Sequence, residues 1–219
     1  MQVKICGVRT QEAAQAAAQS GASAVGFVFA DSPRRVTPEE ATRLAARLSP
    51  SIARVAVFRH PTEQEITDVL DVFPADLIQV EPGRVARAAA GSGVRLLPVL
   101  HDGPGLMEQF SSLGPGHRSG VLLEAAGRGG RGVRPDWTRA ERLAERVSLV
   151  LAGGLSPANV TQAIRHVRPA AVDVSSGVES RPGHKDPRLI RDFVRLAIEA
   201  DREIEPRPTS SRKVFMPCT

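Results

Sequence analysis

Apolar residues in this chain of 219 residues occur in short continuous runs that recur along its whole length. Most runs are apolar at every position rather than at every second one, which is typical of parallel strands buried on both faces. Stretches with apolar residues three and four positions apart lie between the runs and predict amphipathic helices. The runs predicted as strands are Val3–Ile5, Ala24–Phe29, Ile52–Phe58, Leu77–Val80, Val94–Leu100, Gly120–Leu123, Val147–Leu151 and Ala171–Val174.

Four of the predicted helices have recognisable starts. Thr37-Pro-Glu-Glu40 and Thr62-Glu-Gln-Glu65 are capping boxes, in which a threonine and a glutamate three residues later satisfy the first backbone N–H groups of a helix. Ser156-Pro157 and Asp186-Pro187 are expected to open the two last helices, because proline is favoured at the first helical position.

Eight strands, most of them followed by a helix, predict a single (β/α)8 TIM barrel of α/β class over residues 1–205. The alternative is an open doubly wound sheet, which usually carries a glycine fingerprint after its first strand. No such fingerprint follows Val3–Ile5. The helices are least distinct between Glu81 and Ser112. Residues 206–219, rich in proline, serine and basic residues, are predicted to be a flexible or loosely docked tail.

Composition excludes several functions. Aromatic residues make up 4% of the chain and tyrosine is absent, so stacking platforms for single-stranded nucleic acid are not expected. The net charge of +5 comes from scattered arginines, which favours attraction of an anionic metabolite over nucleic-acid binding. No apolar run reaches 18 residues and no basic-then-apolar leader opens the chain, so we expect a cytoplasmic protein without a membrane span.

The two cysteines, Cys6 and Cys218, lie near opposite ends of the chain, and two cysteines in a cytosolic-looking chain do not indicate a disulfide framework. No cysteine and histidine spacing is typical of a zinc site. We therefore predict no metal and no cofactor.

In a TIM barrel the active site lies at the carboxyl ends of the strands. The residues expected in that ring are Cys6, Arg34, Arg35, Glu81, Glu124, Gly153, Gly154, Asp173, Ser175, Ser176 and Gly177. The glycines are the clearest signal, since Gly153-Gly154 and Ser176-Gly177 can expose backbone N–H groups to an anion after strands seven and eight. Ordinary tight turns are the alternative for either loop alone. Their joint placement favours a phosphate site.

The side chains in this ring are open to two interpretations. A free cysteine is usually a small buried hydrophobe, but Cys6 at a strand end facing a carboxylate is suited to catalysis. Glu124 ends an apolar strand, so desolvation should raise its pKa and suit it to act as an acid. A surface glutamate is the alternative. Arg34 is either a solvated loop charge or the partner of a substrate carboxylate.

These residues resemble the phosphoribosylanthranilate isomerase family, over most of the chain from Lys4 to about Ala200. The segments that carry the resemblance are Lys4–Gly7, Gly21–Phe29, Ser32–Pro38, Leu151–Val160, Val172–Glu179 and Pro182–Asp186. It implies a TIM barrel that performs an Amadori rearrangement in tryptophan biosynthesis, as a monomer or homodimer. It also implies that Cys6 and Glu124 are catalytic, that Arg34 and Asp173 bind substrate, and that the two glycine loops bind its phosphate.

Two positions depart from the family pattern. Glu124 stands where the family has an aspartate as general acid, and Glu81 stands where a histidine contacts the substrate. The glycine loop 127–132 is kept, with extra arginines. An anion at position 81 would repel a ring carboxylate by about 1–4 kcal/mol in a partly wet site. The sequence therefore leaves two alternatives open, a paralogue acting on another phosphoribosyl arylamine and a barrel that binds a phosphometabolite without turnover.

Overall fold

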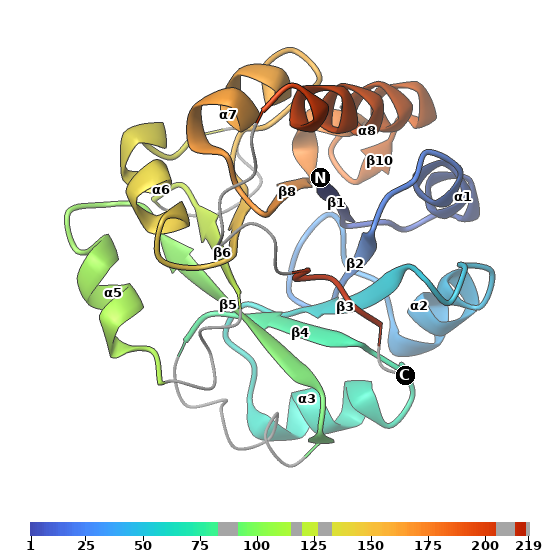
Figure 1. Ribbon diagram of the computed structural model, residues 1–219. Helices are drawn as coiled ribbons and strands as arrows, with labels where there is room; N and C mark the ends of the chain where they lie inside the picture. The colour runs from blue at the N-terminus through green and yellow to red at the C-terminus, as the bar shows by residue number, and fades with distance from the viewer. Residues whose placement is uncertain (83–91, 115–119, 127–132, 205–212, 218–219) are drawn as a thin grey trace.

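The computed structural model describes residues 1–82, 92–114, 120–126, 133–204 and 213–217. Eight parallel strands form a closed barrel in chain order, which confirms the predicted TIM barrel (Figure 1). The strands are β1 (Gln2–Cys6), β2 (Ala24–Val28), β3 (Ala53–Val57), β4 (Leu77–Val80), β5 (Arg95–His101), β6 (Val121–Glu124), β7 (Leu149–Leu151) and β8 (Ala171–Val174). Pairing of β1 with β8 closes the barrel, with Lys4 opposite Asp173.

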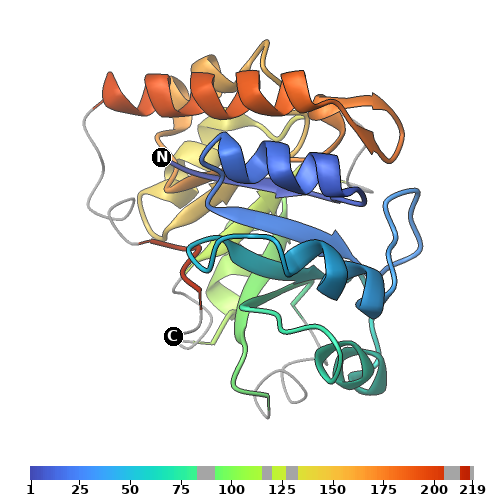
Figure 2. The same ribbon diagram turned by 90° about the vertical axis from the view of Figure 1, so that its right-hand side faces the viewer.

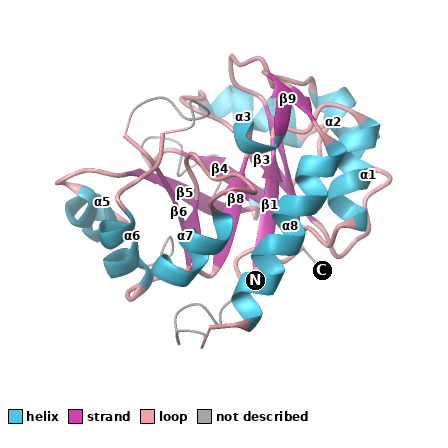
Figure 3. Cartoon of the chain, turned by 90° about the horizontal axis from the view of Figure 1, so that it is seen from above, coloured by secondary structure: helices cyan, strands magenta, loops and turns pink. Residues whose placement is uncertain are grey.

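Helices surround the barrel (Figure 3). They are α1 (Gln11–Gln19), α2 (Pro38–Ala45), α3 (Glu63–Leu70), α5 (Leu106–Ser112), α6 (Trp137–Ala144), α7 (Val160–Val167) and α8 (Pro187–Arg202). Both predicted capping boxes are present, and Asp186 caps α8 as expected. Among the described residues, no helix is long and apolar enough to cross a membrane.

The prediction that Ser156-Pro157 opens α7 was wrong, because the helix begins at Val160. The Asn159 side chain instead accepts a hydrogen bond from the Ser156 N–H and donates one to the Gly154 carbonyl, at 2.9 Å each. These side-chain hydrogen bonds satisfy backbone groups of Gly154 and Ser156, so residues 154–159 form a compact loop and not a turn of regular helix. The loop after β7 therefore keeps its glycines at the rim of the barrel.

Two apolar cores follow from the two faces of the strands. One lies between the strands and the helices and includes Phe27, Phe73 and Phe193, which are fully buried. The other fills the inside of the barrel with smaller aliphatic side chains such as Val55, Leu122 and Val150. Because both faces are covered, the strands are apolar at nearly every position, which explains the pattern in the sequence.

An antiparallel hairpin that the sequence pattern did not predict follows β8. After a short 3₁₀ helix, Ser176–Val178, strand β9 (Glu179–Arg181) pairs with β10 (His184–Lys185). Gly183 at its turn has a φ of 78°, and a Cβ there would lie 2.4 Å from the Pro33 carbonyl oxygen. Glycine is therefore required at this turn, which packs against the loop after β2.

Residues 213–217 dock against the barrel, although their composition predicted a flexible or loosely docked tail (Figure 2). Val214 and Phe215 are 4% and 3% exposed and belong to the core inside the barrel. The Gln2 side chain accepts hydrogen bonds from both of their N–H groups and donates one to the Phe215 carbonyl. Arg95, at the start of β5, donates to the carbonyls of Val214 and Met216. The segment thus closes the amino-terminal end of the barrel.

We expect Phe215→Ala to lower the free energy of unfolding by about 3 kcal/mol, since truncating a buried phenylalanine costs roughly 3–5 kcal/mol and this one lies at an edge of the core. Urea denaturation measures the change. Met216→Ala is the matched control, because this neighbouring side chain is 48% exposed and should change stability by less than about 0.5 kcal/mol. Equal stability of wild type and Phe215→Ala would show that the segment is not docked.

Candidate active site

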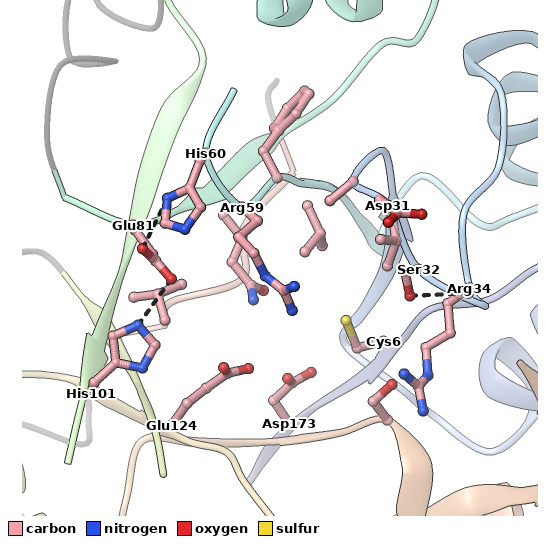
Figure 4. A pocket seen from close by; sticks show the side chains of 17 residues that line it. Cys6, Asp31, Ser32, Arg34, Arg59, His60, Glu81, His101, Glu124 and Asp173 are labelled. Atoms are coloured by element: carbon pink, nitrogen blue, oxygen red, sulfur yellow. Dashed lines mark hydrogen bonds and ion pairs between the residues drawn. The ribbon is translucent and has the colours of Figure 1, made fainter. Parts of the chain in front are cut away.

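A pocket of about 480 Å³ opens at the carboxyl ends of the strands (Figure 4). It brings together the predicted side chains Cys6, Arg34, Glu81, Glu124, Asp173 and Ser175, which come from β1, β2, β4, β6 and β8 or the loops that follow them. In the described parts of the chain, no three histidine, cysteine, aspartate or glutamate side chains are grouped as a metal ion would require.

Cys6 is the last residue of β1 and is 7% exposed. Its side chain fits because the neighbouring strand has Gly26 opposite, where a Cβ would lie 3.1 Å from the sulfur. Burial raises the pKa of the thiol, and the Asp173 charge adds to this, while Lys4 and Lys185 act in the opposite direction. In the ligand-free protein the effect of burial is therefore the larger one. The cations that oppose it are two lysines.

Glu124 ends β6 and faces the same pocket. Burial raises the pKa of its carboxyl, and the Asp173 charge raises it further, as the sequence predicts. A carboxyl that retains its proton nearer to neutral pH is suited to donate it to a substrate.

Asp173 on β8 forms a buried ion pair with Lys4 on β1, with 2.8 Å between Lys4 Nζ and the carboxylate oxygen. Burial by itself would lower the pKa of Lys4, but the Asp173 carboxylate outweighs it, and the pKa is raised. Lys4 was not among the site residues predicted from the sequence. Lys4 lies two residues before Cys6 in the same strand, and this spacing puts both side chains on the same face of the strand.

Arg34 lines the pocket, and one edge of its guanidinium is occupied. Its Nε and Nη2 atoms donate to the two carboxylate oxygens of Glu179 at 2.8 and 2.9 Å. Lys185 donates to the same carboxylate at 2.7 Å. Burial by itself would raise the pKa of Glu179, but these hydrogen bonds outweigh it, and the pKa is lowered. Arg34 is therefore held in place by the hairpin after β8, and within the described residues Nη1 and the second N–H of Nη2 have no protein acceptor.

The two glycine loops lie against each other. A Cβ at Gly177 would stand 1.9 Å from the Leu155 carbonyl oxygen, so only glycine allows this contact. Gly153 and Gly154 have φ values of 84° and 61°, which favour glycine. In the part of the chain described here, their N–H groups donate to no protein acceptor. A small cavity between the loops reaches Glu124 and Asp173. The arrangement is suited to an anion such as phosphate.

Glu81 has two histidine neighbours that sequence reasoning missed. His101 Nε2 lies 3.0 Å from one of its carboxylate oxygens and His60 Nδ1 lies 3.3 Å from the other. The anion that seemed isolated in the sequence is thus flanked by imidazoles (Figure 4). Arg59 also lines the pocket. The predicted fifth strand ended one residue before His101, and the third ended one residue before Arg59, so neither was placed in the ring. The glycine loop 127–132 lies outside the described residues.

The fold and the site define a TIM-barrel enzyme with a thiol and a carboxyl facing one pocket beside an anion site. Residues 3–196 match the family of N-(5'-phosphoribosyl)anthranilate (PRA) isomerases. The chain is 38% identical over 204 residues to the N-(5'-phosphoribosyl)anthranilate isomerase of Listeria monocytogenes, covering 90% of this chain and 98% of that protein.

Solved structures give the same result. A phosphoribosyl anthranilate isomerase in complex with reduced 1-(o-carboxyphenylamino)-1-deoxyribulose 5-phosphate superposes with a TM-score of 0.78 at 34% identity, covering 91% of this chain and 99% of the other. Monomers derived from the dimeric enzyme of Thermotoga maritima superpose with a TM-score of 0.79 at 35% identity and the same coverage. The chain belongs to the phosphoribosylanthranilate isomerase family.

We expect alkylation of Cys6 by iodoacetamide to be slow at pH 8 and still to be rising at pH 9, because burial raises the pKa of the thiol and only the thiolate reacts. The rate is measured against pH in a Cys218→Ser variant, in which Cys6 is the only thiol. A free cysteine peptide, with a pKa of about 8.5, is the reference. A rate that levels off below pH 8 would show instead that the free protein activates this cysteine.

Proposed function

We propose that this chain converts N-(5-phosphoribosyl)anthranilate into 1-(2-carboxyphenylamino)-1-deoxyribulose 5-phosphate, with Glu124 as general acid and Cys6 as general base. The observation that carries the proposal is the placement of Cys6 and Glu124 around one pocket, next to the two glycine loops. The family relationship supports the same reaction.

The first step opens the sugar. Glu124 donates its proton to the ribose ring oxygen as the bond from that oxygen to C1′ breaks, and the lone pair of the arylamine nitrogen forms a Schiff base to C1′. The raised pKa of Glu124 keeps the proton available for this transfer. Burial of the carboxyl also keeps water from competing for it.

The second step moves a proton from carbon to sulfur. The Cys6 thiolate takes the proton from C2′, and the electrons of that C–H bond form the C1′–C2′ double bond and neutralise the Schiff base. The resulting enolamine becomes the ketone when C1′ gains a proton and the C2′ hydroxyl loses one. Cys6 then holds one proton that Glu124 lacks, and transfer between them through solvent resets the enzyme. Lys4 and Lys185 favour the thiolate against the effect of burial.

The remaining site residues bind and orient the substrate in this proposal. Gly153, Gly154, Ser175, Ser176 and Gly177 hold the phosphate. Asp173, held by Lys4, lies beside both reacting groups and accepts a hydrogen bond from a sugar hydroxyl. Arg34 and Glu81 stand on the side of the aryl group, where the histidines beside Glu81 reduce the repulsion expected from its charge.

We further propose that the chain acts in the cytoplasm, on a small phosphorylated substrate, without metal or cofactor, and as a monomer or homodimer. Acid–base chemistry by a thiol and a carboxyl accounts for every bond change above. One structural relative is described as dimeric.

Cys6→Ala and Glu124→Gln are expected to lower kcat by at least about 100-fold, because each removes a proton-transfer group. Both should fail to restore growth to a tryptophan auxotroph that lacks this isomerase, while the wild-type chain restores it. Glu124→Asp is the matched control, since it keeps the carboxyl and should retain measurable turnover.

Thermal unfolding of each variant separates loss of catalysis from loss of structure. Full activity of Cys6→Ala would exclude the thiol as base. A wild-type chain that binds the reduced product analogue and turns over no phosphoribosyl arylamine would be a binding protein instead.

A further inference from the structure

Gln79 carries a buried carboxamide without a hydrogen-bond partner. The residue lies in β4 and is 4% exposed. Within the described part of the chain its carboxamide makes no hydrogen bond, and its Oε1 atom is shielded from solvent. The buried charged side chains are paired: Lys4 donates to Asp173, and Asp76 accepts the backbone N–H of Arg54. An unsatisfied amide in such a place is unfavourable and needs a physical reason.

The strand geometry directs this side chain into the barrel. Successive residues of a strand face opposite sides, and Leu77, two residues earlier, belongs to the core inside the barrel. The register partners of Gln79 are Val57 of β3 and Leu97 of β5, which pack in the same core. Neither of these apolar side chains can bond to an amide, and an apolar side chain of equal size would suit the position better. The fold alone therefore gives no reason for a glutamine here.

The active-site pocket does give one, because Gln79 lines it together with Cys6 and Glu124. In a closed barrel of eight strands in chain order, β4 lies diametrically opposite β8, which carries Asp173. A ligand at the centre of the pocket therefore has Gln79 on one side and Asp173 on the other. The terminal torsion of a glutamine is soft, so the carboxamide can turn either of its ends toward that ligand.

The hydrogen-bond chemistry of a carboxamide limits what it can bind. It donates through Nε2 and accepts through Oε1, so a group that both accepts and donates satisfies it best. An ionised phosphate or carboxylate only accepts, and the N–H of an arylamine only donates. A hydroxyl does both. In a phosphoribosyl arylamine the hydroxyls belong to the ribosyl part, which lies between the phosphate and the aryl ring.

We propose that Gln79 is a substrate-binding residue that holds a hydroxyl of the ribosyl part from inside the barrel. This inference rests on the proposed function and deepens it. The phosphate loops fix one end of the substrate, whereas Gln79 and Asp173 hold the sugar from two opposite sides. The carbon that loses its proton then stays within reach of Cys6. The amide is satisfied in the complex and unsatisfied in the free protein.

Gln79→Met separates a role in binding from a role in the fold. Methionine is similar in size and leaves no polar atom unsatisfied, so the free protein should unfold at the same or a higher urea concentration than wild type. The Kd of the reduced product analogue, measured by calorimetry, should rise by about 10- to 100-fold, because the hydroxyl loses its partner. A glutamine that served only the fold would lower stability when replaced.

Analogues that each lack one hydroxyl of the sugar chain identify the group that Gln79 holds. Wild type should bind one of these analogues about as weakly as Gln79→Met binds the complete analogue. Gln79→Met should bind that same analogue and the complete one equally well, because the amide and the hydroxyl form a single contact.

Gln11→Met is the matched control. Gln11 is the first residue of α1, outside the pocket, and its Nε2 atom is likewise buried without a partner in the residues that the structure describes. The same chemical change at this position should leave the affinity for the complete analogue as in wild type.

Wild-type affinity of Gln79→Met, or a lower urea midpoint than wild type, would overturn the assignment. Equal discrimination among the hydroxyl analogues by wild type and Gln79→Met would overturn it as well. Turnover is measured separately. A wild type that binds the complete analogue and converts no phosphoribosyl arylamine would refute the proposed reaction, while the hydroxyl analogues would still decide the role of Gln79.

Discussion

Lys4 and Asp173 form an ion pair that is almost completely buried at the seam where β1 pairs with β8. Removing one partner of such a pair typically costs about 3–5 kcal/mol, because the other charge stays buried and uncompensated. The two residues stand directly opposite each other in the strand register, so their contact is satisfied only when the barrel closes in this register. Closing the barrel in this register therefore also brings the Lys4 and Asp173 charges together.

The ion pair also sets the electrostatics of the active site. Asp173 raises the pKa of both Cys6 and Glu124, and Lys4 acts in the opposite direction on both. A second buried contact, between Lys185 and Glu179, adds another positive group near the thiol and holds Arg34 at the rim. The proposed acid, Glu124, and the proposed base, Cys6, thus share a charge environment built from neighbouring buried residues. Changes in these supporting residues would alter both reacting groups together.

The sequence was most informative where the physical signal is local. Continuous apolar runs located all eight strands, and two capping boxes located the starts of α2 and α3. Cys6 and Glu124 could be placed in the pocket because each ends such a run. The direction of the Glu124 pKa followed from burial alone.

The sequence was least informative where partners are distant along the chain. Glu179 is 145 residues from Arg34, and no local pattern pairs them. His101 and Arg59 each lie one residue past the end of a predicted run, a difference smaller than the accuracy with which strand ends can be placed. Val214 and Phe215 are too short an apolar pair to show any periodicity, and the polar residues before them gave the whole segment the composition of a tail.

The docked segment has a consequence for the order in which the protein can form. Val214 and Phe215 complete the core inside the barrel, yet they are synthesised after all eight strands and after α8. Until they emerge, the apolar interior is open at the end of the barrel where Gln2 and Arg95 form hydrogen bonds with the backbone of Val214. A nascent chain that has already closed its barrel therefore still exposes apolar surface until Val214 and Phe215 cover that end.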